Sequence, residues 1–139
     1  MGDGELRSQI EAKAGNLGIA DKVIFTGSID YVPQMLSAID MLVLPSHYEG
    51  FPFSVIEAQT AGLKVFASNE VTRDCAFSDL VTYLDLQVDT WVEAIESEEV
   101  RPDRNVSSEN GMKSVVLAGY DIKESANHLT EVYQAYGKK

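Results

Sequence analysis

The sequence predicts an α/β fold of three layers, in which a parallel sheet of about four strands is covered by helices on both faces. Short apolar runs alternate along the chain with longer amphipathic stretches, which is the pattern of strand–helix units. Glycine or proline stands at many of the junctions between them, where turns are expected. The 139 residues, 45% of them hydrophobic, suffice for a core, so we expect a single domain over residues 1–139.

The first half of the chain predicts three helices and two strands. Residues 5–16 carry Leu6, Ile10 and Ala14 on one helical face, and Gly18 follows as a stop signal. A proline suits the first turn of the short second helix. The expected elements are, in order, helix Glu5–Asn16, strand Val23–Thr26, helix Val32–Ile39, strand Met41–Leu44 and helix Phe53–Ala61.

The second half continues the alternation and ends in helices. Residues 101–109 are polar and predict a loop or the entry to a helix, and Asp89 or Thr90 is expected to cap the helix before them. The expected elements are, in order, strand Val65–Ala67, one helical turn at Val71–Asp74, strand Val81–Leu84, a helix through Trp91 and Ile95, helix Gly111–Leu117 and helix Asp121–Tyr136.

The most informative stretch runs from Glu49 to Glu57 and places two carboxylates eight positions apart. The apolar run Met41–Leu44 before it ends at Pro45 and Ser46, so Glu49 is expected in the loop after a buried strand. Glu57 is expected in the first turns of the next helix. In open α/β sheets, ligands bind at the carboxyl ends of the strands, which is where this loop should lie.

The residues between the two glutamates suit an anionic ligand. Gly50 lets the backbone approach a ligand closely because it has no Cβ. Pro52 has a backbone angle that suits the first helical turn. The N–H groups of Phe53, Ser54 and Val55 are expected to point out of the helix start, where they form an anion site that suits a phosphate.

Two carboxylates beside a phosphate site add acceptors for hydroxyl groups. A glutamate accepts hydrogen bonds, so one side chain suits a ribose and the other a hexose. The ligand that this pattern favours has a diphosphate between two sugars, which is a sugar nucleotide. A plainer interpretation is that a Glu near a helix start only stabilises the helix dipole, by ~0.3–1 kcal/mol.

The same stretch resembles a family signature. Glu49 and Glu57, followed by Ala58 and by Ala61-Gly62, resemble the signature of the retaining glycosyltransferases of family 4, which have the GT-B fold. In detail the stretch is similar to that of bacterial capsule and exopolysaccharide transferases. The resemblance runs from about Gly2 to Leu86 and includes three further motifs, namely Gly2–Leu6, Val23–Gly27 and Ile39–Ser46.

The resemblance implies a role for each matching residue. Glu49 would be the catalytic residue, binding hexose hydroxyls of the donor and helping to settle charge at the reacting carbon. Glu57 would hold the ribose hydroxyls, and the backbone from Gly50 to Ser54 would contact the diphosphate and the sugar. Gly27 and Ser28 would lie near the nucleobase, and His47 would lie at the rim of the crevice. Together with these three, the expected donor-binding residues are Glu57, Gly50, Phe51, Pro52, Phe53 and Ser54.

The family further implies a reaction and a place in a larger fold. Its members transfer a hexose with retention from a nucleotide sugar, here expected to be UDP- or GDP-linked, and need no cofactor and no metal. The sequence has no His or Cys cluster at metal-ligand spacing. The chain would be part of the C-terminal, donor-binding half of the enzyme, which is Rossmann-like.

The chain departs from the family pattern at its beginning. We expect it to start at the end of the second strand, so that two strands, an Arg and a Lys that neutralise the diphosphate, and the amino-terminal acceptor domain are absent. The fragment alone is therefore expected to be inactive and to need the missing domain or a companion chain. An uncovered central strand would pair readily, so the isolated chain is expected to self-associate or to be only marginally stable. Lys64 stands where the family has Pro and is expected to extend along the strand start.

Charge and composition exclude some partners and compartments. The net charge of −11 argues against a nucleic-acid partner, for which a basic patch is the usual footprint. The single Cys75 excludes an internal disulfide and fits a reduced, cytoplasmic setting. No apolar run approaches the ~20 residues of a membrane span. We expect a cytoplasmic protein that reaches the inner membrane face only through missing parts.

Other polar and aromatic residues receive plainer predictions. Tyr48 is expected to pack against the protein rather than a sugar, and Arg73 to form a surface salt bridge. The three tyrosines of the last segment are expected to cover the sheet, or to contact another domain as in the family; they are Tyr120, Tyr133 and Tyr136.

Three other functions stay open at this point. A nucleotide-sugar epimerase uses the same two-domain architecture, although the Glu-Gly-Phe-Pro and Glu-Ala-Gln run fits transferases better. A module could also hold a nucleotide sugar without chemistry. Finally, an interaction subunit could complete a split transferase together with a separate chain.

Overall fold

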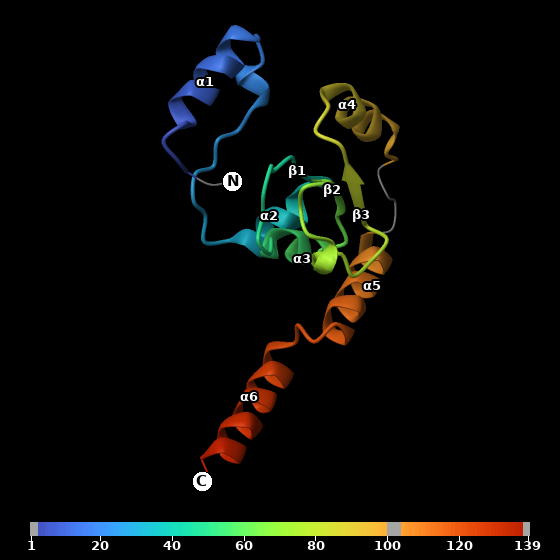
Figure 1. Ribbon diagram of the computed structural model, residues 1–139. Helices are drawn as coiled ribbons and strands as arrows, with labels where there is room; N and C mark the ends of the chain where they lie inside the picture. Colours follow the sequence, from blue (N-terminus) through green and yellow to red (C-terminus); the bar gives the residue numbers. More distant parts are fainter. Residues whose placement is uncertain (1–2, 100–103, 138–139) are drawn as a thin grey trace. The chain divides into compact units, whose positions relative to one another are not determined.

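The computed structural model describes residues 3–99 and 104–137 (Figure 1). The chain divides into two compact units, Met1–Gln34 and Met35–Lys139. Gly2 of the first motif and residues 101–103 of the predicted loop lie outside the described residues. Every candidate site residue lies within the described ranges, with Gly27 and Ser28 in the first unit and the rest in the second.

The first unit is built on α1 (Arg7–Asn16), which is followed by the 3-10 helix η1 (Ala20–Lys22). α1 begins at Arg7 rather than Glu5 because residues 4–7 form a turn, in which the Arg7 N–H donates to the Gly4 carbonyl at 3.0 Å. On the predicted apolar face Ala14 is buried, whereas Leu6 and Ile10 are exposed. This unit therefore has little core of its own.

The predicted strand at residues 23–26 is wrong. The segment is extended at Val23 but joins no named strand in the structure. An extended segment becomes a strand only when a neighbouring strand accepts its backbone hydrogen bonds. Here the segment is instead held by Arg7, whose Nη2 donates to the Phe25 carbonyl at 3.3 Å.

The second unit contains a three-stranded parallel sheet with strand order β1-β2-β3. In register, Met41 pairs with Lys64 and Val65 with Val81. The fold class is confirmed, although the sheet has three strands rather than about four. The elements are α2 (Val32–Ala38), which spans the division between the units, β1 (Met41–Leu44), α3 (Phe53–Thr60), β2 (Lys64–Ser68), the 3-10 helix η2 (Arg73–Cys75), β3 (Val81–Leu84), α4 (Val88–Ser97), α5 (Arg104–Leu117) and α6 (Ile122–Tyr136).

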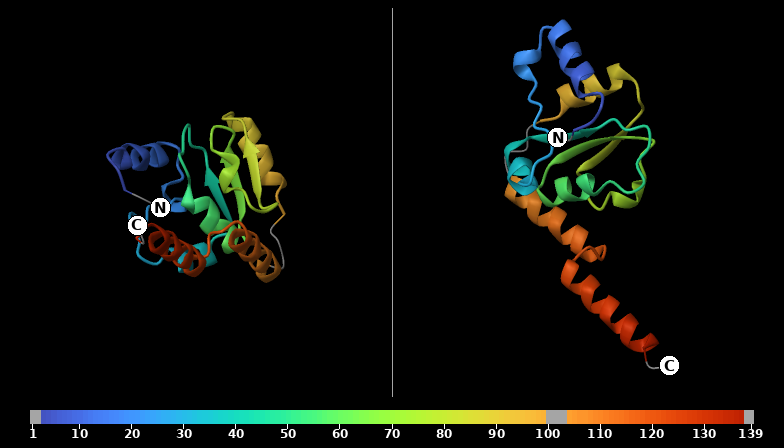
Figure 2. Two further views of the ribbon diagram at one scale, coloured as in Figure 1. Left: turned by 60° about the horizontal axis from the view of Figure 1, so that its bottom comes forward. Right: turned by 90° about the vertical axis from the view of Figure 1, so that its left-hand side faces the viewer.

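The core of this unit lies where α3 packs between the sheet and α5 (Figures 1 and 2). Val55 and Ala58 of α3 and Val65 of β2 are fully buried. Gly111 of α5 permits the close crossing with α3, since a Cβ there would lie 1.9 Å from the carbonyl oxygen of Gln59. The apolar face of α3 therefore has a partner on both sides.

The boundaries of α4 and α5 differ from the prediction. α4 begins at Val88 after Gln87, so Asp89 lies in the first helical turn and does not cap it. A carboxylate in that turn still favours the helix dipole. α5 begins at Arg104, earlier than the predicted Gly111, and the Arg104 side chain is hydrogen-bonded to the ends of two other helices.

That side chain is a structural clamp. Arg104 Nε donates to the Ala61 carbonyl at 3.0 Å, at the end of α3. Its Nη1 donates to the carbonyls of Ser37 and Ile39 at 3.0 and 2.9 Å, and its Nη2 donates to that of Leu36. The last carbonyls of a helix lack intrahelical donors, so one guanidinium satisfies the ends of both α2 and α3.

α6 contrasts with these packed helices. Asp121 caps it by accepting from the N–H groups of Lys123 and Glu124 at 2.8 and 3.1 Å. None of its residues is buried. Tyr133 and Tyr136 are exposed, so they do not cover the sheet, and the alternative that they contact another domain stays a prediction. Among the described residues, no helix is long and apolar enough to cross a bilayer.

Candidate functional site

The candidate site is built on the loop of residues 45–52, called the site loop, between β1 and α3. Ser68, at the end of β2, donates its hydroxyl to the Ser46 carbonyl. The Ser46 hydroxyl in turn donates to Glu49 Oε1 at 2.9 Å. Glu49 also pairs with Val71 in an isolated parallel bridge. These contacts fix a half-buried carboxylate at the carboxyl edge of the sheet.

Glu57 is placed differently from Glu49. It lies in α3, as predicted, and its side chain is exposed. In the described part of the chain its carboxylate makes no hydrogen bond or ion pair, so all its lone pairs can accept from a ligand. One glutamate is thus held by the protein and the other is free to move.

The start of α3 offers fewer donors than predicted. The Val55 N–H is taken by the Pro52 carbonyl at 3.0 Å, so the prediction that it points outward is wrong. The N–H groups of Phe53 and Ser54 are the first two of the helix and have no intrahelical acceptor. An anion at this end would therefore meet two backbone donors and the positive end of the helix dipole.

The remaining residues of the site loop vary in exposure. Gly50 has open space where a Cβ would lie, which leaves its backbone accessible. His47 is exposed, in keeping with its predicted place at a rim. Tyr48 is 81% exposed, so the prediction that it packs against the protein is wrong. Phe51 is half-buried and stacks on Tyr120.

The two candidate residues of the first unit are described within that unit. Gly27 has a φ of +65°, a left-handed conformation that other residues rarely adopt, and it lies beside Arg7. Ser28 is exposed. The predicted glycine turn is therefore formed, while its role near a nucleobase stays a prediction.

Gln59 is a residue of this site that the sequence analysis missed. Its side chain is completely buried. Its Nε2 donates to the carbonyls of Val55 and Cys75 at 3.0 and 2.8 Å. Its Oε1 accepts from the N–H groups of Phe77 and Ser78 at 2.9 and 3.1 Å. A glutamine on the apolar face of a short helix is the signal from which such an anchor could have been predicted.

The segment after β2 carries a second cluster of polar groups. Arg73 stacks on the Tyr83 ring, with its guanidinium carbon 4.3 Å from the ring centroid, and donates to Asn69 Oδ1 at 3.0 Å. Within the described residues Arg73 forms no ion pair, so the predicted salt bridge is wrong. The predicted turn here is the 3-10 helix η2, which starts at Arg73 because Val71 pairs with Glu49.

Burial shifts two pKa values beside this cluster. Desolvation, together with the hydrogen bond to Cys75, raises the pKa of Tyr83 to about 12. The Tyr83 hydroxyl donates to the Thr72 carbonyl at 2.9 Å. Desolvation also raises the pKa of the Cys75 thiol. Both groups are therefore neutral at physiological pH, and Cys75 is not an activated nucleophile.

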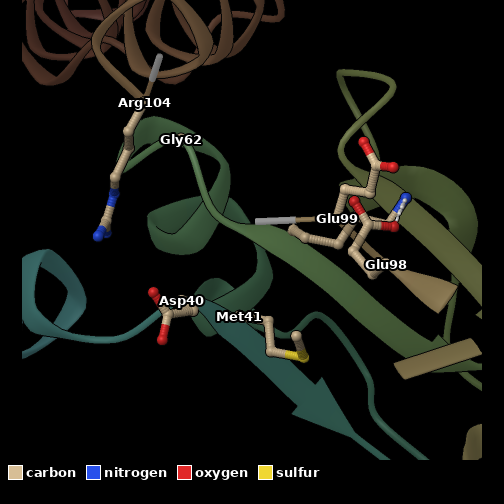
Figure 3. A pocket seen from close by; sticks show the side chains of 7 residues that line it. Asp40, Met41, Gly62, Glu98, Glu99 and Arg104 are labelled. Carbon is tan, nitrogen blue, oxygen red and sulfur yellow. Dashed lines mark ion pairs between the residues drawn. The ribbon is translucent and has the colours of Figure 1, made fainter. Parts of the chain in front are cut away.

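The opposite, amino-terminal edge of the sheet holds a small notch of about 50 Å³ (Figure 3). Glu98 and Glu99 line one side of it, and Arg104 reaches in from α5 with its guanidinium turned toward the chain before β1. Lys64 lies here and pairs with Glu98 at 3.4 Å. Lys64 is thus at the edge of the sheet away from the site loop, and its ammonium group does not neutralise the Glu49 carboxylate.

The sequence is similar to those of known glycosyltransferases. Residues 1–84 match the family model of glycosyl transferases group 1. EpsF of Bacillus subtilis (strain 168), which is named as a glycosyltransferase, is 32% identical over 143 residues, covering 99% of this chain and 36% of EpsF. The UDP-Gal:alpha-D-GlcNAc-diphosphoundecaprenol alpha-1,3-galactosyltransferase of Escherichia coli is 26% identical, covering 96% of this chain and 35% of that protein.

A solved structure has a fold similar to that of this chain. The sucrose-phosphate synthase of Thermosynechococcus elongatus superposes with a TM-score of 0.77 at 25% identity, covering all of this chain and 36% of that one. The chain spans about a third of the length of these proteins. The architecture is that of a piece of a Rossmann-like half of a GT-B enzyme, and the chain belongs to the glycosyl transferases group 1 family.

Proposed function

We propose that this chain is a partial domain that binds the nucleotide-sugar donor of a retaining, family 4-type glycosyltransferase in capsule or exopolysaccharide biosynthesis. It would belong to the C-terminal half of the enzyme. The observation that carries the proposal is the fixed position of Glu49 at the carboxyl edge of the sheet, beside the free N–H groups that open α3. The relatives support transfer of a sugar and do not favour the epimerase or the non-catalytic alternatives.

The site loop would hold the donor by its diphosphate and its two sugars. Phosphate oxygens would accept from the N–H groups of Phe53 and Ser54, with Gly50 allowing close approach. Glu57 would accept from the ribose hydroxyls. Glu49 already accepts one hydrogen bond from Ser46 and has further lone pairs for hexose hydroxyls.

The transfer itself would proceed on one face of the sugar. The bond from the anomeric carbon to the diphosphate breaks, and the nucleoside diphosphate leaves with the electron pair. An acceptor hydroxyl bonds to the same carbon from the same side, and its proton passes to the leaving phosphate. The Glu49 carboxylate would stabilise the positive charge that develops at the carbon, which is an electrostatic effect in a fixed geometry.

The proposal includes partners that lie outside this chain. The acceptor would bind to an amino-terminal domain or a companion chain, and this fragment alone would not transfer sugar. The reaction would need no metal and no cofactor beyond the UDP- or GDP-linked donor. The setting would be cytoplasmic, with any contact to the inner membrane face made by other parts of the enzyme.

Calorimetric titration of the 139-residue chain tests the proposal. The ligands are UDP, GDP, UDP-glucose, UDP-galactose and GDP-mannose, each with and without EDTA. We expect binding of one nucleotide series in both conditions. Glu57→Ala should weaken the affinity for the free nucleotide, whereas Glu49→Ala should remove only the extra affinity that the sugar adds.

Two variants on the same helix and loop serve as controls. Thr60→Ala lies in α3 and Tyr48→Ala in the site loop, and neither is assigned a role in the donor site. Both should bind as the parent does. If the parent binds no nucleotide in any series, or if Glu49→Ala and Glu57→Ala bind as well as the parent, the proposed function is rejected.

A further inference from the structure

A ladder of aromatic rings connects the site loop to the junction between α5 and α6. The Phe51 ring stacks on Tyr120, with centroids 5.7 Å apart and an interplanar angle of 17°. Tyr120 also meets Phe77, with centroids 5.1 Å apart. Phe53 meets Phe51 edge-on at 5.5 Å. The rings come from three segments that are distant in the sequence, and Tyr120 is the one that joins the other two.

The Phe77 end of the ladder is fixed independently of the rings. The Phe77 N–H donates to Gln59 Oε1 at 2.9 Å, and the side chain of Gln59 is completely buried in α3. The same oxygen accepts from the Ser78 N–H and hydroxyl at 3.1 and 3.0 Å. Phe77 is therefore a platform held by the core.

The Tyr120 backbone is fixed as well. Its N–H donates to the Val115 carbonyl at 3.2 Å, at the end of α5. Gly119 has a φ of +90°, which turns the chain before the ring, and Asp121 caps α6 directly after it. The backbone thus places the ring, and within the described residues its hydroxyl makes no hydrogen bond.

The site loop has less support of its own. Gly50 has open space around it and Tyr48 projects outward. Between the Glu49–Val71 bridge and the start of α3, the loop is fastened by the buried Pro52 and by Phe51, whose ring rests on Tyr120. Loss of Tyr120 would therefore release one of the two attachments of this stretch.

We propose that Tyr120 is a positioning residue, whose ring holds Phe51 and thereby sets the backbone of residues 50–54 for the diphosphate of the donor. This inference rests on the proposed function for its consequence in binding. The ring lies at the junction of α5 and α6, two residues before α6 begins at Ile122.

Hydrogen exchange of the 139-residue chain without ligand tests the positioning directly. In Tyr120→Ala, the amide of Val55 should exchange about tenfold faster, because its N–H donates to the Pro52 carbonyl at 3.0 Å and loses this bond when residues 50–54 open. An aromatic stack contributes up to about 1.5 kcal/mol, and about 1.4 kcal/mol is a tenfold change in the opening equilibrium. Amides of β2 (Lys64–Ser68) should keep their parent rates. Faster exchange in β2 to the same extent would mean general destabilisation and would overturn the inference.

Two further variants separate the ring from its surroundings. Tyr120→Phe keeps the stacking ring and should restore the parent rates, since the hydroxyl has no partner in the described part of the chain. Tyr133→Ala removes an exposed tyrosine from α6 and should leave the exchange rate of the Val55 amide unchanged. Failure of Tyr120→Phe to restore the rates would also overturn the inference.

The effect of the Tyr120 ring on donor binding is tested in a separate measurement of the Kd of UDP and of GDP. Tyr120→Ala should raise the Kd of whichever nucleotide the parent binds by about tenfold, and Tyr120→Phe should not. If the parent binds neither nucleotide, the proposed function fails while the exchange result still decides the positioning role. If exchange of the Val55 amide becomes faster and the Kd of a bound nucleotide stays unchanged, the link between the Tyr120 ring and the donor site is refuted.

Discussion

Two helices of this chain, α3 and α6, show what decides whether an apolar face is buried. α3 has eight residues, and four of them, Val55, Ile56, Ala58 and Gln59, are buried. α6 has fifteen residues and none is buried. Both are regular helices with a clear end, so the difference lies outside the helices themselves. α3 has the sheet on one side and α5 on the other, and α6 has no such partner in the described residues.

The comparison separates two sources of helix stability. α6 has an apolar stripe of Leu129, Val132, Tyr133 and Tyr136 and a good N-cap at Asp121, so its local sequence favours a helix. α3 is shorter than an isolated helix needs to be and depends on packing. We therefore expect changes around α3 to alter the stability of the whole second unit, and changes in α6 to act only locally.

The largest effect is expected from Gly111→Ala. The new Cβ would lie 1.9 Å from the Gln59 carbonyl oxygen, which is backbone of α3 and cannot rotate away. Helix α5 must move, at a cost of about 3 kcal/mol or more, the upper end for overpacking. The change is measured by urea unfolding followed through Trp91, the single tryptophan of the chain.

Asn110→Ala is the matched control for that substitution. Asn110 precedes Gly111 on the same helix and is exposed, so its replacement should change the free energy of unfolding by less than about 0.5 kcal/mol. Equal midpoints for Gly111→Ala and Asn110→Ala would show that α3 and α5 do not cross as closely as described.

Gln59→Leu is expected to have the next largest effect. Leucine fills similar space but leaves the N–H groups of Phe77 and Ser78 and the Cys75 carbonyl without their partner. An unpaired buried polar group costs about 1–3 kcal/mol, and the half-buried position of Phe77 and Ser78 should hold the total near 2–3 kcal/mol. Thermal unfolding of the variant, with Gln134→Leu on exposed α6 as control, checks the value. A Tm equal to that of the control would contradict it.

The residues of the candidate site also show how far the sequence could predict it. The strand ending at Leu44 and the helix start at Phe53 follow from local apolar pattern, proline and glycine, and both are confirmed. That placed Glu49 in the loop and Glu57 on the helix. Apart from the Val55 carbonyl four positions away, the partners of Gln59 come from residues sixteen to nineteen positions away, and no local pattern specifies them.

The errors have the same physical origin. Residues 23–26 have the composition of a strand, but a strand also needs a neighbour that the sequence does not name. Tyr48 and Tyr120 are alike as residues, and only the tertiary structure leaves one exposed and stacks the other on Phe51. Arg73 was expected to pair with a carboxylate, but its guanidinium stacks on the ring of Tyr83 instead.

Asp121→Ala should have a local effect only. The variant loses the acceptor of the Lys123 and Glu124 N–H groups, which typically costs ~0.5–2 kcal/mol of helix stability. Amides in the first turn of α6 should exchange several-fold faster, while the urea midpoint reported by Trp91 stays at the parent value. Asp121→Asn, which keeps a capping oxygen, should behave as the parent. A lower Trp91 midpoint for Asp121→Ala would show that α6 supports the core after all.

The smallest effect is a change of slope with pH at Tyr83. Its pKa is about 12 in the folded chain against 10.0 for an ordinary tyrosine, because burial and the bond to Cys75 favour the neutral phenol. A raised folded pKa contributes stability that is present below pH 10 and is lost as pH rises toward about 12. Tyr83→Phe cannot ionise, so its free energy of unfolding should fall less steeply across that window.

The quantity that tests the Tyr83 prediction is the slope of the free energy of unfolding against pH, and not its absolute value. Loss of the hydrogen bond to the Thr72 carbonyl lowers the stability of Tyr83→Phe by about 1 kcal/mol at every pH below the window. The Cys75 thiol, whose pKa is also raised by burial, leaves some pH dependence in both proteins. Tyr133→Phe, at an exposed position, should keep the parent slope. Parallel curves for Tyr83→Phe and the parent between pH 10 and 12 would mean that Tyr83 is as accessible to water as the tyrosines of α6.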